Sequence, residues 1–123
     1  SMMTPTIARL ADGSQLALGS GGSNRIRSAI LQVLANMLEF DMGLQQAVEA
    51  PRLHLEGDLL NVEHGFSSTA LAALVQEWPG VKQWPGRNLL FGGVHAVERL
   101  ANGEFRATGD PRRGGAVAIA DFS

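Results

Sequence analysis

Apolar residues recur along the chain with two periods, one typical of helices and one typical of strands. The clearest helical repeat gives one buried face, formed by Ile26, Ile30, Val33, Leu34 and Met37. Ser23 or Asn24 is a favourable N-cap for this segment, and Gly43 is a stop signal. We therefore predict a helix that starts after residue 23 or 24 and runs to about Phe40.

The other segments predict two further helices and a set of short strands. A helix is expected at 44–49, and another at 69–78, capped by Ser67 or Ser68 and ended by Pro79 and Gly80. Strand-like patterns lie at 6–10, 15–18, 52–56, 59–63, 81–84, 93–100, 104–108 and 116–120. The dipeptides Asp12-Gly13, Gly57-Asp58 and Asn102-Gly103 are favoured in tight turns between antiparallel strands.

These elements predict an α+β layered domain with a largely antiparallel sheet and one or two helices on one face. The second face is expected to be covered as well, because Val117 and Ile119 alternate with alanines rather than with charged residues. A single domain over residues 2–123 is predicted, since the chain shows no repeat, linker or low-complexity segment. Ser1, ahead of two methionines, is interpreted as a remnant of tag cleavage.

Composition narrows the classes of partner. The chain of 123 residues is 45% hydrophobic and 18% charged, with a formal net charge of −2, which is typical of a soluble globular protein. With a single lysine, Lys82, and scattered arginines, nucleic acid is not an expected partner. There is neither an apolar run of bilayer length nor an export signal, so no membrane association is expected. The absence of cysteine excludes disulfides but leaves the compartment open.

The Gly/Ser-rich stretch at 19–24 lies at the mouth of the best predicted helix. It lacks the lysine of a phosphate-binding P-loop, and Asn24 stands where a dinucleotide-binding pattern needs its last glycine. Small residues at a helix N-terminus let backbone N–H groups approach an anion or a developing oxyanion. The alternative is a tight strand-to-helix turn without a ligand.

A series of motifs in one order decides between these interpretations. They are TPTI at 4–7, Asp12-Gly13, GSGGSNRI at 19–26, LQV at 31–33 with Asn36, QAVEAPRLH at 46–54 and GDPR at 109–112. In order and spacing, they closely resemble the C-terminal part of the small subunit of γ-glutamyltranspeptidases. The resemblance implies part of an N-terminal nucleophile hydrolase fold, an αββα sandwich.

The resemblance also implies a reaction and a site. In the family, a γ-glutamyl group of glutathione or a related amide passes through an N-terminal threonine to water or an amino acid, without a cofactor. Backbone N–H groups of two adjacent loop residues hold the oxyanion. Ungapped alignment places this pair at Gly22 and Ser23, whereas matching glycine to glycine places it at Gly21 and Gly22.

Other family features have no counterpart here. The nucleophile matches none of the threonines of the chain, and the serine pair that binds the substrate carboxylate falls on Ser1 and Met2. We therefore expect about the last two thirds of a small subunit, inactive without its upstream part and the large subunit, which would be its partners. A γ-glutamyl substrate is then expected only in the complete enzyme.

Two alternatives remain at this point. One is a non-catalytic half-fold that forms a homodimer through surfaces which the rest of the enzyme would cover. The other is a standalone hydrolase in which Ser20 or Ser23 acts as nucleophile. Turnover of γ-glutamyl-p-nitroanilide would separate these classes.

The remaining polar and aromatic residues favour structural roles. The spacing of His54, His64 and His95 fits no ligand pattern, so no metal site is expected, and His95 is predicted to be partly buried in a strand. Asp110-Pro111-Arg112 is interpreted as a turn with a locally paired arginine. Trp78 and Trp84 are expected in core or edge packing.

Overall fold

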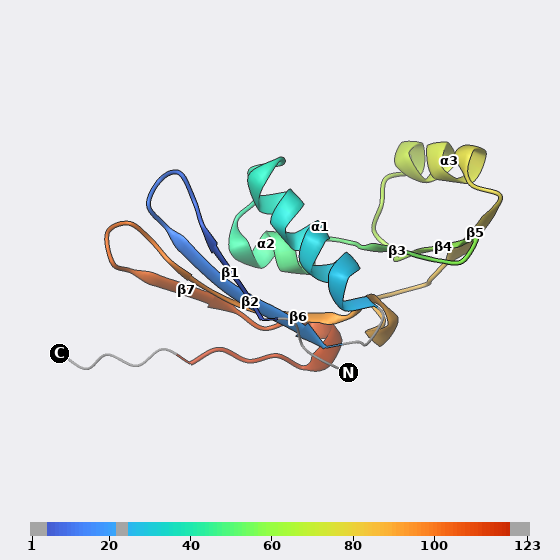
Figure 1. The fold of residues 1–123 in the computed structure, drawn as a ribbon. Coiled ribbons are helices and arrows are strands. Elements are labelled where there is room, and N and C mark those ends of the chain that lie inside the picture. Colours follow the sequence, from blue (N-terminus) through green and yellow to red (C-terminus); the bar gives the residue numbers. More distant parts are fainter. Residues whose placement is uncertain (1–4, 22–24, 119–123) are drawn as a thin grey trace.

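The computed structural model describes residues 5–21 and 25–118, which form two sheets, one with two α-helices on one side and the other with one α-helix (Figure 1). One sheet has the strand order β1-β2-β6-β7, and the other has the order β3-β4-β5. The elements are β1 (Thr6–Arg9), β2 (Gln15–Gly21), α1 (Ile26–Leu38), α2 (Leu44–Glu49), β3 (Leu53–Glu56), β4 (Leu59–Val62), α3 (Ser68–Glu77), β5 (Gly80–Gln83), the 3-10 helix η2 (Leu89–Phe91), β6 (Gly93–Arg99), β7 (Phe105–Thr108) and the 3-10 helix η3 (Pro111–Arg113).

The four-stranded sheet is antiparallel throughout, which confirms the predicted sheet type. Its outer hairpins turn at Gly13 and Gly103, whose positive φ angles of 90° and 92° suit glycine. Strand β2 is longer than predicted and ends at Gly21 rather than residue 18. It continues because β6 pairs with it as far as Gly93, so sheet hydrogen bonding outweighs the low strand propensity of glycine.

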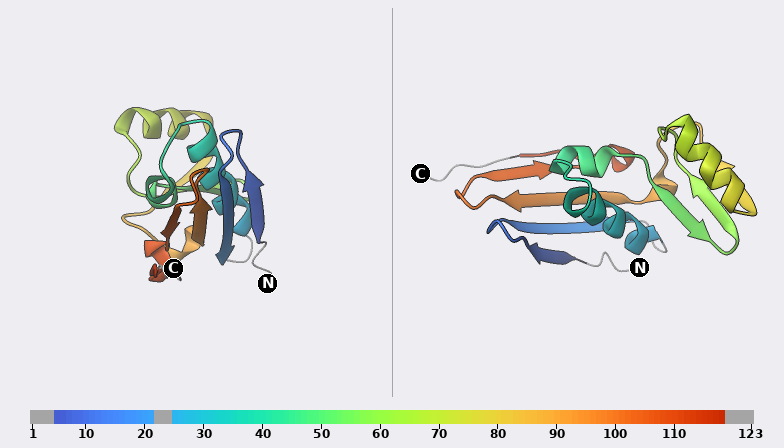
Figure 2. Two further views of the ribbon diagram at one scale, coloured as in Figure 1. Left: turned by 90° about the vertical axis from the view of Figure 1, so that its left-hand side faces the viewer. Right: turned by 90° about the horizontal axis from the view of Figure 1, so that it is seen from above.

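Helices α1 and α2 cover one face of this sheet and form the main core with it (Figures 1 and 2). Residues of β2 and β6 that point to the helices alternate along each strand with residues that point away. The buried apolar residues are Leu16, Leu18, Ile26, Ala29, Ile30, Val33, Leu44, Ala47, Val48, Val94 and Ala96. Each large side chain in this set contributes about 1.5–3 kcal/mol through burial.

The helix boundaries agree with the predicted ones to within a few residues. Helix α2 has the predicted bounds, and α1 ends at Leu38, two residues before the expected end. The N-cap of α1 is Arg25, whereas the predicted caps Ser23 and Asn24 lie outside the described residues. Helix α3 begins one residue early, with the Ser67 hydroxyl accepting a hydrogen bond from the Ala70 N–H at 3.1 Å.

The smaller sheet combines an antiparallel pair, β3 and β4, with β5, which runs parallel to β4. Trp84 follows β5 and donates from Nε1 to Oδ1 of Asn61 at 3.1 Å. Its ring stands edge-on to Phe91, with 6.0 Å between centroids, and Lys82 lies over it. The packing role predicted for Trp84 is therefore confirmed, whereas Trp78 is 37% exposed at the end of α3.

The second face of the four-stranded sheet is open, contrary to the sequence expectation. Ala116, Val117 and Ala118 form no strand, and Val117 is 48% exposed; the predicted residues 119 and 120 lie outside the described ones. The chain turns at Gly114, where φ is +60°, and Gly115 then packs on Gly109, so the last described segment runs beside the β7 edge of the sheet (Figure 2). Among the described residues, no helix has the length and apolarity to cross a membrane.

Candidate functional site

Strand β2 leads the glycine-rich stretch into the first turn of α1 at one end of the four-stranded sheet. The last residue of the strand, Gly21, pairs with Gly93 and points to the open face. Gly22 and Ser23, the other predicted oxyanion-binding residues, lie outside the described residues. At the start of α1, the side chain of Arg25 makes no capping hydrogen bond, and the positive end of the helix dipole faces this region.

Ser20 points to the opposite side of the sheet and is only 1% exposed. Its hydroxyl donates to the carbonyl oxygen of Gly21 at 2.8 Å and accepts from the N–H of Gly93 at 3.3 Å. A Cβ on Gly92 would lie 3.0 Å from this oxygen, so the hydroxyl is tightly enclosed. Ser20 therefore joins β2 to β6 and is not accessible as a nucleophile, which weighs against the standalone hydrolase.

His54 supports the first turn of α1 from the neighbouring strand β3. Its Nδ1 lies 3.1 Å from the hydroxyl oxygen of Ser28, and the residue is 5% exposed. Burial lowers the pKa of His54, and although nearby Glu56 opposes this effect, Arg25 adds to it. The ring is therefore neutral at neutral pH and acts as a packing and hydrogen-bonding group, the structural role expected from the sequence.

A buried cluster of four charged residues joins the two sheets behind the glycine stretch. Arg112 binds the carboxylate of Glu63 through Nε and a terminal nitrogen, and it also donates to Oδ1 of Asp110 at 3.1 Å. Arg52 lies 2.8 Å from Oδ2 of Asp110. All four side chains are almost completely buried. Each positive charge has a negative partner within the cluster, which offsets the cost of burying it.

Backbone groups complete the hydrogen bonding of this cluster. Arg112 donates to the carbonyl oxygens of Val48 and Ala50, at the end of α2, and Asp110 accepts from the N–H of Val94 at 2.8 Å. Asp110 also caps η3 by accepting from the N–H of Arg112, which confirms the predicted turn and local pairing. The long-range contact with Glu63 was not predicted.

The pKa of Asp110 reflects this enclosure. Burial by itself would raise this pKa. The pKa nevertheless lies below its ordinary value, because Arg52 is charged, the N–H groups of Val94 and Arg112 donate to the carboxylate, and Arg112 is charged as well. Burial would lower the pKa of Arg112, whereas the hydrogen bond to Glu63 and the charge of Asp110 raise it. Asp110 and Arg112 thus stay ionised, and their contacts hold η3 against α2 and β6.

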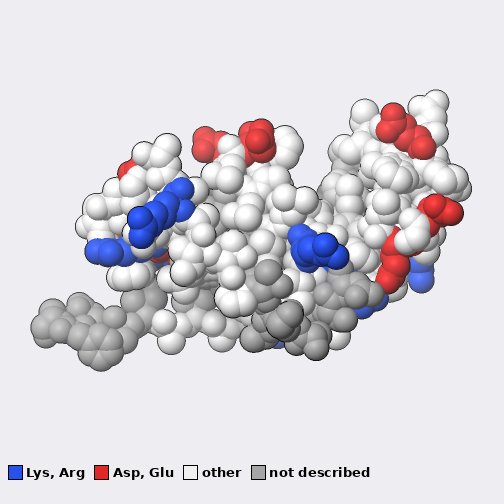
Figure 3. Space-filling view, viewed as in Figure 1, with Lys and Arg blue, Asp and Glu red and all other residues white. Residues whose placement is uncertain are grey.

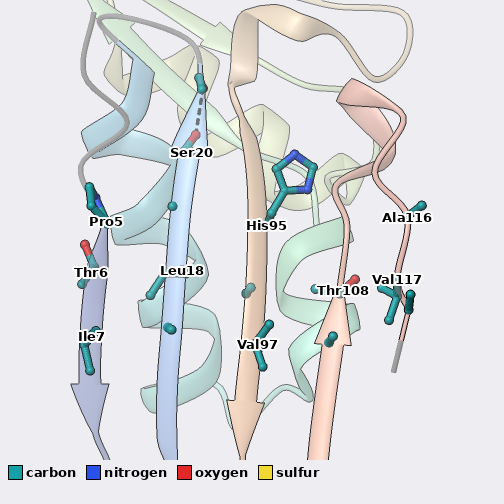
Figure 4. Close-up of a pocket in the computed structure, with 16 residues that line it drawn as sticks. Pro5, Thr6, Ile7, Leu18, Ser20, His95, Val97, Thr108, Ala116 and Val117 are labelled. Carbon is teal, nitrogen blue, oxygen red and sulfur yellow. Dashed lines mark hydrogen bonds between the residues drawn. The ribbon is translucent and has the colours of Figure 1, made fainter. Parts of the chain in front are cut away.

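The open face carries a shallow groove next to the glycine stretch (Figure 4). Its volume is about 620 Å³, and Ile7, Leu18, His95, Val97 and Val117 are among its lining residues. His95 is exposed rather than partly buried as predicted, because it occupies an outward position of β6. Its Nδ1 lies 3.4 Å from the N–H of Asp110, which ties the groove to the start of η3.

The three histidines lie on separate elements, and the described residues contain no group of three side chains suited to holding a metal ion. Sequence reasoning did not single out Glu63, Arg113 or Gly93. In the sequence, Glu63 has the pattern of an ordinary strand residue. Its role depends on the contact with Arg112, which is 49 residues away in sequence. The Gly92-Gly93 pair at the start of β6 was an available signal for close packing at this end of the sheet.

Comparisons with known proteins agree with this geometry. The profile of the family described as gamma-glutamyltranspeptidase matches residues 1–120. The chain is 32% identical over 114 residues to the glutathione hydrolase proenzyme of Escherichia coli K12, covering 91% of this chain and 19% of that protein. It is also 32% identical over 115 residues to the acylase ACY 1 proenzyme of Pseudomonas sp. strain SE83, covering 89% and 20%.

Among solved structures, the Bacillus anthracis transpeptidase CapD superimposes with a TM-score of 0.81 at 27% identity, over 97% of this chain and 71% of that chain. The α+β arrangement is therefore part of an N-terminal nucleophile hydrolase fold, as the resemblance implied. The chain belongs to the γ-glutamyltranspeptidase family. It spans about a fifth of the length of the curated relatives it matches.

Proposed function

We propose that this chain supplies the oxyanion-binding loop of an enzyme that transfers or hydrolyses γ-glutamyl groups of glutathione or related amides. The backbone N–H groups of two adjacent residues among Gly21, Gly22 and Ser23 stabilise the negative oxygen of the tetrahedral intermediate. The attacking threonine and the large subunit are contributed by polypeptide outside this chain. The 123 residues alone are therefore inactive.

One observation carries the proposal: β2 ends at Gly21 on the open face, and α1 begins only a few residues later. Gly21 has no side chain of its own, although the Arg113 side chain lies over it on the open face, and the positive helix end favours an anion. The buried pairing of Arg52, Asp110, Glu63 and Arg112 gives the surrounding backbone a rigid support. The names of the relatives, glutathione hydrolase and acylase, fit amide hydrolysis through such an oxyanion.

The test is a chimera in which this chain replaces the matched part of the E. coli glutathione hydrolase proenzyme. Proline has no N–H, so Gly21→Pro, Gly22→Pro and Ser23→Pro each delete one donor, with alanine at the same position as control. Loss of a true donor is expected to lower kcat for γ-glutamyl-p-nitroanilide by about 10²–10³-fold. If Gly21→Pro keeps the rate of its control, the donors are Gly22 and Ser23. If Ser23→Pro keeps the rate of its control, the donors are Gly21 and Gly22.

Three proline variants with the rate of their alanine controls would contradict the proposed oxyanion role. The chain alone is expected to release no p-nitroaniline. Release that Ser23→Ala abolishes would instead favour the standalone hydrolase with a serine nucleophile.

A second candidate function is self-association without catalysis. It is favoured by the apolar residues on the open face, since Ile7 is 77% exposed, Phe105 55% and Val97 45%. Light scattering on the purified chain tests it, and a discrete dimer disrupted by Ile7→Lys would support this role. A monomer at all concentrations would exclude it.

A further inference from the structure

The first turn of helix α1 is held by side-chain contacts with strand β3 rather than by a cap of its own. Its N-cap residue, Arg25, makes no side-chain capping hydrogen bond. The hydroxyl oxygen of Ser28 lies 3.1 Å from Nδ1 of His54 in β3. One turn further on, Gln32 donates to the carbonyl oxygen of Leu53 at 2.6 Å and accepts from its N–H at 2.7 Å. Gln32 also donates to the Ser28 carbonyl oxygen at 3.0 Å, so both contacts act on one turn of the helix.

Strand β3 is itself fixed on both sides of this contact. Arg52, two residues before His54, is buried in the charged cluster, and its backbone N–H donates to Oε1 of Glu63 at 3.1 Å. On the side of β4, Asn61 donates from Nδ2 to the carbonyl oxygen of His54 at 3.2 Å. The position of the His54 ring is therefore set by the smaller sheet and the cluster, independently of Ser28.

Apolar packing supplies no comparable constraint on the first turn of α1. The helix packs on the four-stranded sheet through Ile26, Ile30 and Val33, and such contacts have no preferred direction. Hydrogen bonds are directional and weaken steeply when distance or angle changes. The orientation of this turn therefore depends on the contacts that Ser28 and Gln32 make with β3.

One of the two ring nitrogens of His54 makes the contact with α1. The other, Nε2, is buried without a hydrogen-bond partner among the described residues. Oε2 of Glu56 lies 3.9 Å from it, which is too long for a hydrogen bond. Glu56 is half-exposed, on a sheet whose surface carries acidic side chains (Figure 3). The Nδ1 side of the ring and the Nε2 side can therefore be tested separately.

We propose that His54 and Ser28 are positioning residues for the oxyanion-binding loop. The inference rests on the proposed function, because the loop leads directly into the first turn of α1. By holding this turn against β3, the pair keeps the backbone donors of the loop directed at the place where the negative oxygen develops. Such placement acts in the transition state, so its loss lowers kcat and leaves KM unchanged. Neither side chain needs to touch the substrate.

Asparagine and glutamine at position 54 distinguish positioning from packing. The amide of asparagine lies about as far from the backbone as Nδ1, whereas that of glutamine lies about as far as Nε2. In the chimera with the E. coli proenzyme, His54→Gln should lower kcat for γ-glutamyl-p-nitroanilide about 10–100-fold per folded molecule, and His54→Asn less than about threefold. A role in packing alone reverses this order, because asparagine leaves the larger cavity. The reversed order would overturn the proposal.

Substitutions at Ser28 and Glu56 test the two sides of the ring. Ser28→Ala should lower kcat as much as His54→Gln, and the double variant should lose no more, because each change removes the same contact. Ser28→Thr retains the hydroxyl and should keep kcat within about threefold of the parent chimera. Glu56→Gln is the matched control on the Nε2 side and should change kcat less than about twofold. Additive losses in the double variant, a loss in Ser28→Thr equal to that in Ser28→Ala, or a loss in Glu56→Gln equal to that in His54→Gln would each overturn the proposal.

The 123-residue chain gives a readout that needs no turnover. The backbone N–H groups of residues 29–32 donate to carbonyl oxygens of the first turn in a regular α-helix. Their hydrogen exchange should become about tenfold faster in His54→Gln and Ser28→Ala, whereas exchange at 35–38 should stay unchanged. Equal exchange in the variants and the parent chain would overturn the proposal.

The proline variants separate this inference from the proposed function. If they lose activity but His54→Gln and Ser28→Ala keep their kcat, the oxyanion role holds and the positioning role fails. If no proline variant affects turnover, the oxyanion role itself fails, whatever the substitutions at positions 28 and 54 do.

Discussion

The two faces of the four-stranded sheet have opposite constructions. The face towards α1 and α2 carries Leu16, Leu18 and Val94, which are at most 4% exposed, and it is sealed by apolar helix residues. The open face carries Ala17 and Gly19 at the centre of β2 and His95 and Val97 at the centre of β6, with Ile7 exposed at one edge. The helix-covered face therefore supplies the core that stabilises this chain, whereas the open face leaves room for a binding partner.

Charges follow the same division. On the inner side, four charged side chains form the closed cluster around Arg112, where burial is tolerated because each charge has a partner of opposite sign. On the open side, Arg113 lies over bare backbone. Because these two arginines are adjacent in sequence, substitutions at them give the most direct comparison of the two faces.

The largest effect is expected for Arg112→Met. Removing this charge leaves Glu63 and Asp110 buried with only Arg52 as a positive partner, so unfolding free energy should fall by about 3–5 kcal/mol. Arg113→Met is the matched control and should change stability by less than about 0.5 kcal/mol, since the side chain is exposed. Urea denaturation followed by circular dichroism measures both. Similar values for the two variants would contradict the division of charges.

The fold was largely predictable because it depends on local signals. Turn dipeptides placed the hairpins, and the apolar period of residues 26–37 placed α1. The strand predicted at 116–120 was wrong over its described part, because alternation with alanine does not supply a pairing partner. The open face was expected only in the half-fold interpretation, in which the rest of the enzyme would cover exposed surfaces, whereas the apolar pattern at 116–120 had indicated a covered second face.

The site was less predictable than the fold. The family motifs drew attention to residues 21–23, of which Gly21 alone is described. The cluster depends on Glu63 meeting Arg112 across 49 residues, and such a contact leaves no local pattern. The exposure of Arg113 is set by the η3 turn, whose direction only the three-dimensional structure reveals.

The next effect compares apolar side chains on the two faces. Leu16→Ala removes a fully buried side chain from the helix-covered face and should cost about 2–5 kcal/mol. Ile7→Ala removes a side chain of equal size that is 77% exposed, so its cost should stay below about 0.5 kcal/mol. Thermal and urea unfolding of both variants provide the measurement. A large loss from Ile7→Ala would mean that the open face is covered in solution, as self-association would require.

The smallest effect is expected for His54, which is buried beside the first turn of α1. Because burial lowers the pKa of His54 in the folded chain, the unfolded chain binds a proton at higher pH than the folded one does. Stability should therefore fall as pH falls below the ordinary histidine value of about 6.5, by at most about 1.4 kcal/mol per pH unit. His54→Gln should reduce the dependence of the unfolding free energy on pH between about pH 7.5 and 5.5. Ordinary carboxylates titrate below this range, so they contribute little to it. An unchanged slope in His54→Gln would show that another group is responsible.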